Sequence, residues 1–236
     1  MAEELREIIF DTETTGIDSE HDRVIEIGGV ELLNKFPTGR TFHVYINAGG
    51  RKVHPEALAV HGITDEFLAD KPTFEQIVEE MENLFDGAKL VAHNASFDIG
   101  FFNAEFARIG RPPVDPGRVV DTLALARRRH PMGPNSLDAL CRRYGIDNSR
   151  RTKHGALLDA ELLAEVYIEM NGGRQAALGL VDVRLASEEQ SAVTLSGEVG
   201  SRPEPLPRRL TESEQAAHDN LVEGLGDKAL WTVHYN

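Results

Sequence analysis

Residues 8–16 read Ile-Ile-Phe-Asp-Thr-Glu-Thr-Thr-Gly, an apolar run followed directly by two acidic residues. Residues 8–10 predict a short buried β-strand, because each is β-branched or aromatic. Side chains two apart on a strand point to the same face, so Asp11 and Glu13 should project together from the end of this strand. Two unpaired carboxylates at that range repel each other and are costly to bury. A divalent cation would neutralise them, and their oxygen ligands favour Mg²⁺ or Mn²⁺.

Alone, an Asp-x-Glu pair is more often a solvated acidic turn than a metal site. Matching carboxylates appear later in the chain, at Asp98 near a predicted helix start and at Asp159 in the first turns of another helix. His154 precedes Asp159 by five residues, so a loop histidine and a helical carboxylate can converge on one pocket. A histidine with an unperturbed pKa of roughly 6.5 accepts a proton near neutral pH. The alternative for His154 is an ordinary surface loop histidine.

The remaining pattern predicts an α/β fold with a mixed five-stranded sheet flanked by helices. Strands at residues 24–32 and 41–46 should form an antiparallel meander with the first strand, with turn residues between them at 34–39. Two later strands, 90–92 and 119–120, alternate with helices, which is typical of an α/β sheet. The expected helices span residues 54–62, 74–85, 98–109, 122–130, 136–145, 156–170 and 211–226.

Composition restricts the class of protein. The net charge of −14, from 25 basic and 39 acidic residues, argues against a protein that coats nucleic acid with a broad basic face. It leaves room for an enzyme that holds a few terminal nucleotides through metal ions, and it suggests that another protein delivers the substrate. The single cysteine, Cys141, lies on an apolar helical face and is expected in the core. Without a signal peptide or a run of about 18 apolar residues, the chain is expected to be soluble, cytoplasmic and not bound to a membrane.

Three segments together resemble the motifs of DEDDh 3′–5′ exonucleases of the RNase H-like superfamily. They are Asp11-Thr-Glu-Thr-Thr-Gly16, His93-Asn-Ala-Ser-Phe-Asp98 and His154-Gly-Ala-Leu-Leu-Asp159. The resemblance covers about residues 5–175 and no motif residue is missing. Within the superfamily the motifs are most similar to those of the epsilon (proofreading) subunits of bacterial DNA polymerase III. Three motifs in order are strong evidence, whereas each alone is weak.

The resemblance implies an RNase H-like exonuclease fold and hydrolysis at the 3′ end with two divalent ions, Mg²⁺ or Mn²⁺, releasing nucleoside 5′-monophosphates. Asp11, Glu13 and Asp159 would hold the metals, with Asp98 binding one of them through water. His154 would be the general base. The expected catalytic set is therefore Asp11, Glu13, Asp98, His154 and Asp159.

Other candidates for contact with the terminal nucleotide, besides Asp11, Glu13 and Asp159, are weaker. Thr12 and Thr14 can present backbone groups to it. Glu56 and His61 resemble residues that contact the terminal nucleotide in the epsilon family, but they can equally be exposed polar residues on a short helix. Phe97 can stack on a base or belong to the core. Asp121 and Asp138 are interpreted as helix-start residues. A basic cluster, expected to be either a solvated face or a contact for substrate phosphates, comprises Arg142, Arg143, Arg150, Arg151 and Lys153.

The C-terminal part departs from this pattern, so the expected domains are an exonuclease domain at 1–175, a flexible linker at 176–210 and a partner-binding segment at 211–236. Alternating prolines at 203, 205 and 207 favour an extended linker. Residues 175–180 resemble peptides that bind the bacterial sliding clamp, through Gln175, Leu178 and Leu180; the alternative is a helix-exit segment. Leu230 and Trp231 lie in an apolar patch that, by resemblance, binds the polymerase.

The favoured interpretation is a proofreading exonuclease that acts on the single-stranded 3′ end of DNA. Its implied partners are the polymerase III alpha subunit and the beta sliding clamp, while a small theta-like subunit is left open. One alternative is a stand-alone RNA exonuclease, such as an oligoribonuclease or a tRNA-trimming enzyme, which would not need the C-terminal segments. Another is a catalytically idle binding module, which would lack a motif residue. The residues alone do not decide between DNA and RNA, or between Mg²⁺ and Mn²⁺.

Overall fold

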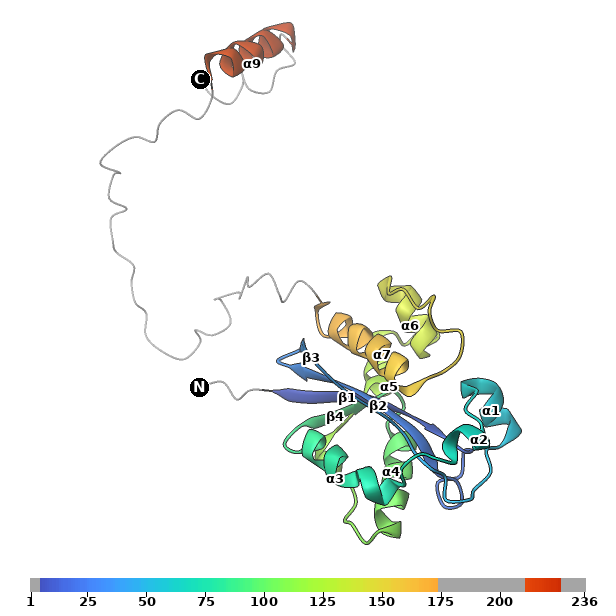
Figure 1. The fold of residues 1–236 in the computed structure, drawn as a ribbon. Coiled ribbons are helices and arrows are strands. Elements are labelled where there is room, and N and C mark those ends of the chain that lie inside the picture. Colours follow the sequence, from blue (N-terminus) through green and yellow to red (C-terminus); the bar gives the residue numbers. More distant parts are fainter. Residues whose placement is uncertain (1–4, 174–210, 226–236) are drawn as a thin grey trace, which may run out of the picture. The chain divides into compact units, whose positions relative to one another are not determined.

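The computed structural model describes residues 5–173 and 211–225 (Figure 1), which belong to two separate units. The predicted clamp-binding residues Gln175, Leu178 and Leu180 and the predicted polymerase-binding residues Leu230 and Trp231 lie outside the described residues. Within the described part of the chain, none of the helices combines the length and the apolar character needed to cross a bilayer.

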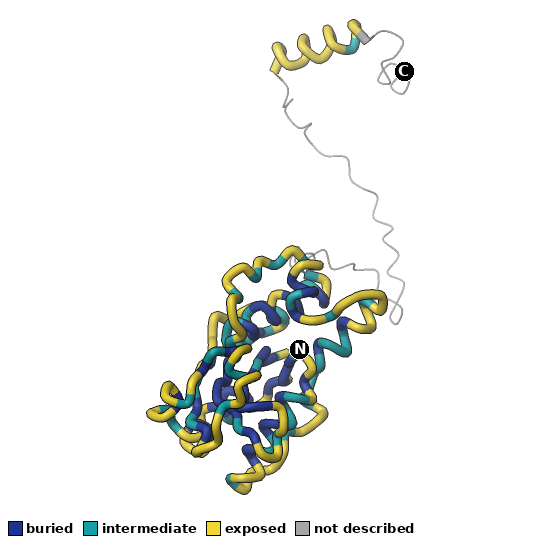
Figure 2. Tube along the Cα trace, turned by 90° about the vertical axis from the view of Figure 1, so that its right-hand side faces the viewer, coloured by how far each residue is buried: buried dark blue, intermediate teal, exposed yellow. Residues whose placement is uncertain are grey.

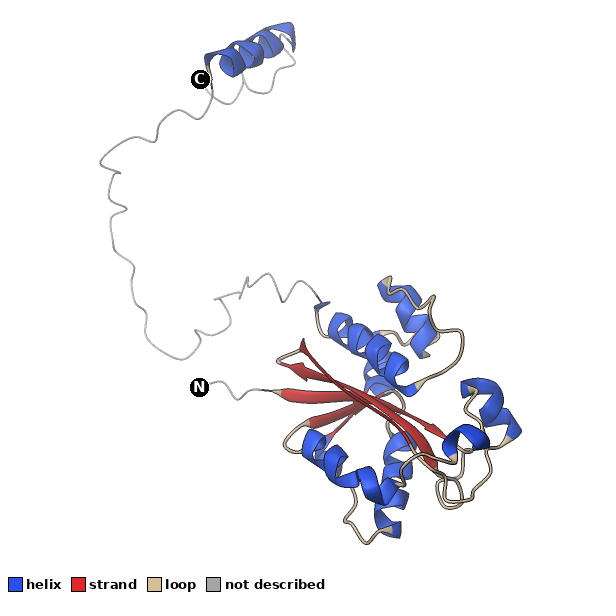
Figure 3. Cartoon of the chain, in the orientation of Figure 1, coloured by secondary structure: helices blue, strands red, loops and turns tan. Residues whose placement is uncertain are grey.

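A mixed five-stranded sheet forms the centre of the first unit, as predicted (Figure 3). The strands lie in the order β3-β2-β1-β4-β5. β1 pairs antiparallel with β2, and β2 with β3, whereas β1, β4 and β5 run parallel to one another. Their bounds are β1 Arg6–Thr14, β2 Val24–Leu33, β3 Phe36–Tyr45, β4 Lys89–Ala92 and β5 Val119–Asp121.

Helices cover both faces of this sheet, because successive residues of β1 point to opposite sides. Ile8 and Phe10 pack in one core with α3 and α4, while Ile9 packs in a second core with α6 and α7. Figure 2 shows the buried residues concentrated in these inner layers. The helices of this unit are α1 Pro55–His61, α2 Asp65–Leu68, α3 Phe74–Phe85, α4 Ser96–Arg108, α5 Thr122–Arg129, α6 Leu137–Tyr144 and α7 Ala156–Met170, with a 3₁₀ turn at Pro116–Arg118.

Two element boundaries differ from the sequence prediction for local reasons. β1 continues through Thr14, so Asp11 and Glu13 lie within the strand; the ladder with β2 pairs them with Gly28 and Glu26. β3 begins at Phe36, five residues earlier than expected, because the turn needs only two residues. Asn34 and Lys35 adopt left-handed φ angles of 52° and 71°, which closes the hairpin between β2 and β3.

Gly28 allows α7 to lie directly against the sheet. It pairs with Asp11 in the β1–β2 ladder. A Cβ atom at this position would lie 2.1 Å from the backbone nitrogen of Leu157, in the first turn of α7. Only glycine permits so close an approach of two backbones. The missing side chain therefore brings the start of α7, which carries Asp159, over the middle of β1.

The second unit contributes one described helix, α9 Glu212–Leu225. Thr211 begins it with a capping box: its hydroxyl accepts a hydrogen bond from the Glu214 amide, and the Glu214 carboxylate accepts one from the Thr211 amide. Residues 212–221 are exposed, including Leu221. A helix of this length is marginal alone in water.

Candidate active site

The three predicted motif segments meet at a cavity of about 790 Å³. It lies where the C-terminal half of β1 faces the loop after β4 and the start of α7. All five predicted catalytic residues line it: Asp11, Glu13, Asp98, His154 and Asp159. Segments some 145 residues apart in the chain, at 11–13 and 154–159, thus supply one group of side chains.

Asp11 and Glu13 enter the cavity from the same face of β1, as the alternation of a strand requires. Glu13 is buried, and its Oε1 atom has no hydrogen-bond partner among the described residues. A buried carboxylate oxygen without a donor is costly unless a cation or water completes its surroundings.

Asp98 is positioned by β1 and by the loop that precedes α4. It lies in the first turn of α4, is 3% exposed, and accepts a hydrogen bond of 2.7 Å from the Thr12 hydroxyl. The preceding loop is held by Asp121, whose Oδ1 accepts hydrogen bonds from the amide of Asn94 at 3.0 Å and from that of Leu123 at 2.9 Å. Asp121 caps α5, as predicted for a helix-start residue, and it also fixes the second motif.

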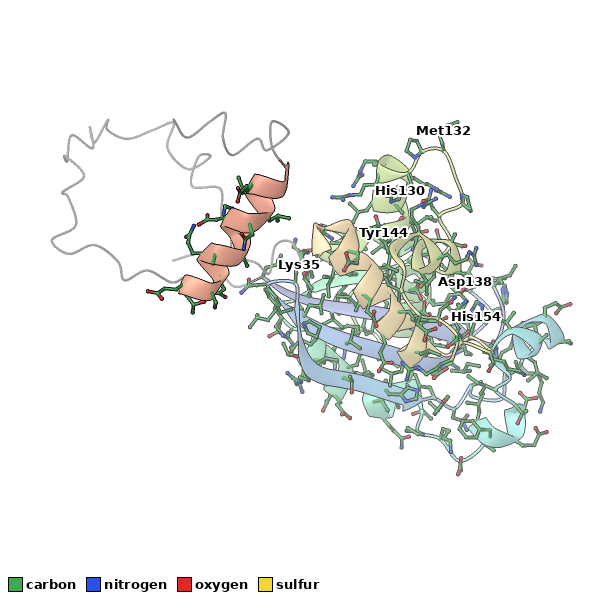
Figure 4. The ribbon with its side chains drawn as sticks, turned by 90° about the horizontal axis from the view of Figure 1, so that it is seen from above. Lys35, His130, Met132, Asp138, Tyr144 and His154 are labelled. Atoms are coloured by element: carbon green, nitrogen blue, oxygen red, sulfur yellow. The ribbon has the colours of Figure 1, made fainter. Side chains whose placement is uncertain are left out.

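Asp159 lies in the first turn of α7 and contacts two basic side chains from the loop before the helix. Arg151 donates from Nε to Oδ1 at 2.5 Å and from Nη2 to Oδ2 at 2.6 Å. The His154 Nδ1 atom lies 3.7 Å from Asp159 Oδ2 and accepts a hydrogen bond of 3.1 Å from Arg151 Nη2. Asp138, on α6, approaches the same guanidinium at 3.1 Å; Figure 4 labels Asp138 and His154 at this end of α7.

The acidic residues are held in an electrostatically unfavourable arrangement. Burial, followed by repulsion from Asp98, Glu13 and Asp159, raises the pKa of Asp11 well above its ordinary value. Burial and neighbouring carboxylates raise the pKa of Glu13 to about 8, and burial raises that of Asp98 to about 7. Burial, reinforced by Arg151, instead lowers the pKa of His154, so its ring is neutral at pH 7.

These residues fit a site for divalent cations. Ligand atoms of Glu13, His154 and Asp159 lie within 4.8 Å of one another, and Asp11 joins Glu13 on the same face of β1. Hard carboxylate oxygens suit Mg²⁺ and Mn²⁺, and bound cations would reverse the repulsion that raises the acidic pKa values. A second acidic group, Asp18, Glu20 and His21, is fully exposed and has no comparable burial.

A family model described as Exonuclease (RNase_T) matches residues 8–167. The chain belongs to this exonuclease family. Along nearly its whole length it is similar to the DNA polymerase III subunit epsilon of Escherichia coli (strain K12), with 46% identity covering 96% of this chain and 97% of that one. The protein of the same name from Rickettsia conorii (strain Malish 7) is 49% identical over 75% of this chain and 79% of its own. By this similarity the chain is a 3′–5′ exonuclease of the DNA polymerase III epsilon type.

Solved structures of the exonuclease family have the same fold. Exonuclease X in complex with 5′ overhanging duplex DNA aligns with a TM-score of 0.56 at 29% identity, covering 71% of this chain and 91% of that one. The nuclease domain of 3′hExo, a DEDDh family member bound to rAMP, aligns with a TM-score of 0.62 at 18% identity over 72% and 94% of the two chains. The second likeness concerns the fold alone.

The weaker sequence candidates lie in and around this cavity. Thr12 and Phe97 line the cavity, whereas Glu56 and His61 on α1 are not among its lining residues. His61 is buried, and its Nδ1 accepts a hydrogen bond from the Ile63 amide, which stabilises the turn after α1. The Thr14 hydroxyl donates to the Gly16 carbonyl at 2.5 Å. α1 still touches the site, because the His154 amide donates to the Val60 carbonyl at 3.3 Å.

Two features of the site were not assigned from the sequence. Asp138, interpreted as a helix-start residue, also pairs with Arg151 on the cavity wall. Arg127 lines the cavity, and it is one of five exposed arginines on α5 and α6, which we call the arginine rim. From the sequence, only the two arginines on α6 were noted, as part of a basic cluster. None of these arginines forms an ion pair with an acidic side chain in residues 5–173 or 211–225; they are Arg127, Arg128, Arg129, Arg142 and Arg143. Cys141 is buried in the core, as predicted.

Proposed function

We propose that this chain removes mispaired 3′-terminal nucleotides from DNA with Asp11, Glu13, Asp98, Asp159 and His154 as its catalytic residues. The observation that carries the proposal is their convergence from three separate motifs on one cavity. Asp11, Glu13 and Asp159 would hold two divalent ions, with Asp98 binding one through water. Bound Mg²⁺ or Mn²⁺ would supply an activated water and charge stabilisation at the leaving 3′ oxygen.

His154 is the general base in this proposal. Its lowered pKa favours the neutral imidazole, which accepts the proton of the attacking water. Its exposed side chain lies at the mouth of the cavity, where water and a phosphodiester both have access. Asp159 lies close enough to stabilise the imidazolium that forms after proton transfer.

The arginine rim of α5 and α6 gives the substrate strand a direction. Arg127 lines the cavity itself, and the other four arginines continue away from it over α5 and α6. On a chain with a net charge of −14, these arginines, which have no ion-pair partner among the described residues, favour contact with phosphate oxygens. Phe97, which is half-buried at the cavity wall, offers a face for stacking of the terminal base.

The C-terminal segments deliver the exonuclease to its substrate. We assign residues 1–175 to catalysis, 176–210 to a linker that begins with the clamp-binding peptide Gln175–Leu180, and 211–236 to binding of the polymerase III alpha subunit. The exposed helix α9 supports the last assignment, because an isolated helix gains stability by packing on a partner. The beta sliding clamp is the second partner. A theta-like subunit on the exonuclease domain is compatible with this arrangement, and we place the assembly in the cytoplasm.

The test is degradation of a 3′-mismatched primer by the full chain and by residues 1–180, each with and without the polymerase alpha subunit. We expect both to degrade a short single strand, and only the full chain to bind the polymerase and to remove the mismatch faster in its presence. Gln175→Ala with Leu178→Ala should weaken clamp binding alone. Faster degradation of single-stranded RNA than of DNA, together with polymerase binding by residues 1–180, would instead favour a stand-alone RNA exonuclease.

A further inference from the structure

Arg151 occupies the centre of the candidate site. Its side chain is only 8% exposed, and its guanidinium contacts three other side chains. It holds Asp159 through two parallel hydrogen bonds, donates to His154 Nδ1 at 3.1 Å, and donates from Nη1 to Asp138 Oδ1 at 3.1 Å. Apart from Arg151 and the neutral ring of His154, no basic side chain contacts Asp159 within the described ranges.

Two of these contacts occupy groups that the proposed reaction needs. The parallel hydrogen bonds engage one lone pair on each oxygen of Asp159, so a cation that binds the remaining lone pairs lies beside the guanidinium charge and competes with it. Arginine only donates hydrogen bonds, so Nδ1 of His154 must be the acceptor, and it has no free lone pair while this contact lasts. Arg151 therefore opposes cation binding at a proposed metal ligand and blocks one nitrogen of the proposed base at the same time.

The third contact gives the guanidinium a place to remain when it leaves Asp159. Asp138 is 43% exposed on the cavity wall, and its Oδ1 also accepts a hydrogen bond from Asn148 at 2.9 Å, which fixes its orientation. Its Oδ2 has no hydrogen-bond partner among residues 5–173. Asp138 thus keeps an acceptor oxygen for a second arginine hydrogen bond.

We propose that Arg151 is a latch: it pairs with Asp159 and His154 in the metal-free site, and it shifts onto Asp138 when a divalent cation takes Asp159. The shift frees the metal ligand and His154 Nδ1 in one movement, so His154 becomes available only when the site is loaded. This inference rests on the proposed metal-binding role of Asp159. Arg151 is a positioning residue, since it acts through Asp159 and His154.

The test measures Mn²⁺ affinity of the full chain by titration calorimetry without substrate. Arg151→Lys keeps the charge but cannot make two parallel hydrogen bonds to one carboxylate. The latch predicts that Arg151→Lys and Arg151→Gln both bind Mn²⁺ about tenfold more tightly, the scale of one lost charge-assisted hydrogen bond. The matched control is Arg150→Gln, which removes the neighbouring exposed charge and should leave the affinity unchanged. If charge alone matters, Arg151→Lys will bind like the wild type, and the latch is refuted.

Asp138→Asn separates the latch from simple electrostatics. With its alternative acceptor weakened, Arg151 should hold Asp159 longer, so Mn²⁺ should bind several-fold more weakly. In the Arg151→Gln background the same substitution should have no effect; an equal loss in both backgrounds would contradict the latch. The melting temperature in EDTA monitors folding, and we expect it to fall for Arg151→Gln and not for Arg150→Gln. Failure of the wild type itself to bind Mn²⁺ would refute the metal site, whereas normal binding with no response to Arg151→Lys would refute only the latch.

Discussion

β1 carries buried carboxylates at both of its ends, on the same face of the sheet, and their surroundings differ. At the N-terminal end, Glu7 is 1% exposed; its Oε1 accepts hydrogen bonds from Lys35 at 2.5 Å and from Tyr167 at 2.7 Å. Asp11 and Glu13, four and six residues further along the strand, form no ion pair with a lysine or arginine among the described residues. The chain therefore neutralises one buried carboxylate with its own cation and leaves the others crowded together.

This difference separates a structural charge from a functional one. Lys35 also donates to Tyr167 at 2.7 Å, so Glu7, Lys35 and Tyr167 form a hydrogen-bonded cluster that joins β1, the β2–β3 turn and α7. Burial, with the hydrogen bond to Glu7, raises the pKa of Tyr167. The Oε2 atom of Glu7 has no hydrogen-bond partner among the described residues, so the adjacent Lys35 charge is what distinguishes this end of β1. Crowded carboxylates with raised pKa values and no such counter-charge attract an external cation. Substitutions at the two ends of β1 should consequently have opposite effects.

The largest effect is expected at the catalytic end. Asp11→Asn should lower exonuclease turnover by about 10³-fold, because several kcal/mol of transition-state stabilisation depend on the bound metal. The same change relieves repulsion, so the melting temperature in EDTA should stay constant or rise. Initial rates in Mg²⁺ and thermal unfolding in EDTA measure the two quantities. Wild-type turnover in Asp11→Asn would remove this residue from the metal site.

The opposite result is expected at the N-terminal end. Lys35→Met leaves Glu7 buried without its cation, which should lower the free energy of unfolding by about 3 kcal/mol. Turnover at a temperature where the variant is folded should be unchanged, since the cluster lies outside the cavity lining. Urea denaturation gives the stability. Adding Glu7→Gln to Lys35→Met should restore part of the loss; a further loss instead would show that the charge pair is not what stabilises this end.

His154→Ala tests the base at the mouth of the cavity. We expect turnover to fall by about 10²-fold, the usual scale for a lost general base. Burial and Arg151 lower the pKa of His154, so the wild-type rate should rise with pH through a value below that of free histidine and then level off. Only the neutral ring accepts a proton, which sets this sign. The variant should lack the acidic limb of the profile, and an unchanged profile would exclude His154 from the mechanism.

The sequence predicted this contrast only in part. The strand alternation placed Asp11 and Glu13 on one face, and the helices predicted at 74–85 and 136–145 correspond to α3 and α6, because these signals depend on neighbours in the chain. The convergence of the three motifs came from resemblance to a family. Ion pairs between different elements have no local signal in the sequence. Arg151 was interpreted as part of a basic cluster, and its ion pair with Asp159, eight residues later on α7, was not predicted.

Gly28 illustrates the same limit. Nothing in the alternation of β2 indicates that a glycine there must admit the backbone of α7, since that requirement arises only when residues 28 and 157 meet in space. Likewise Glu7 was not identified as a buried charge, because its partners Lys35 and Tyr167 lie 28 and 160 residues away in the chain. Tertiary partners decide whether an acidic residue on β1 is structural or functional.

A smaller effect is expected at the arginine rim. Arg128→Gln with Arg143→Gln should raise KM for a single strand several-fold and leave kcat unchanged, because these side chains contact no catalytic residue. If each arginine meets one phosphate, the slope of log affinity against log salt should fall by about 0.7 per arginine. Arg111→Gln serves as the control, since Arg111, in the loop after α4, pairs with Glu82 on α3. An equal rise in KM for Arg111→Gln would show that the effect depends only on net charge.

The smallest expected effect is a change in how the melting temperature depends on pH, and it again compares the two ends of β1. The pKa of Glu13 in the folded chain is raised from 4.5 to about 8, so the stability it contributes is fully present below pH 4.5 and is lost as the pH rises towards 8. In EDTA the melting temperature of the wild type should therefore decline between about pH 5 and 8 relative to that of Glu13→Gln. The glutamine side chain is uncharged over this whole range, as protonated Glu13 is. Glu56→Gln changes an exposed glutamate outside the cavity lining, so this variant should keep the wild-type decline.

Adding Mg²⁺ should raise the wild-type melting temperature more at pH 8 than at pH 5, because the ligands must lose their protons to bind the ion. Parallel curves for the wild type and Glu13→Gln in EDTA would mean that Glu13 is neutralised within the chain, as Glu7 is.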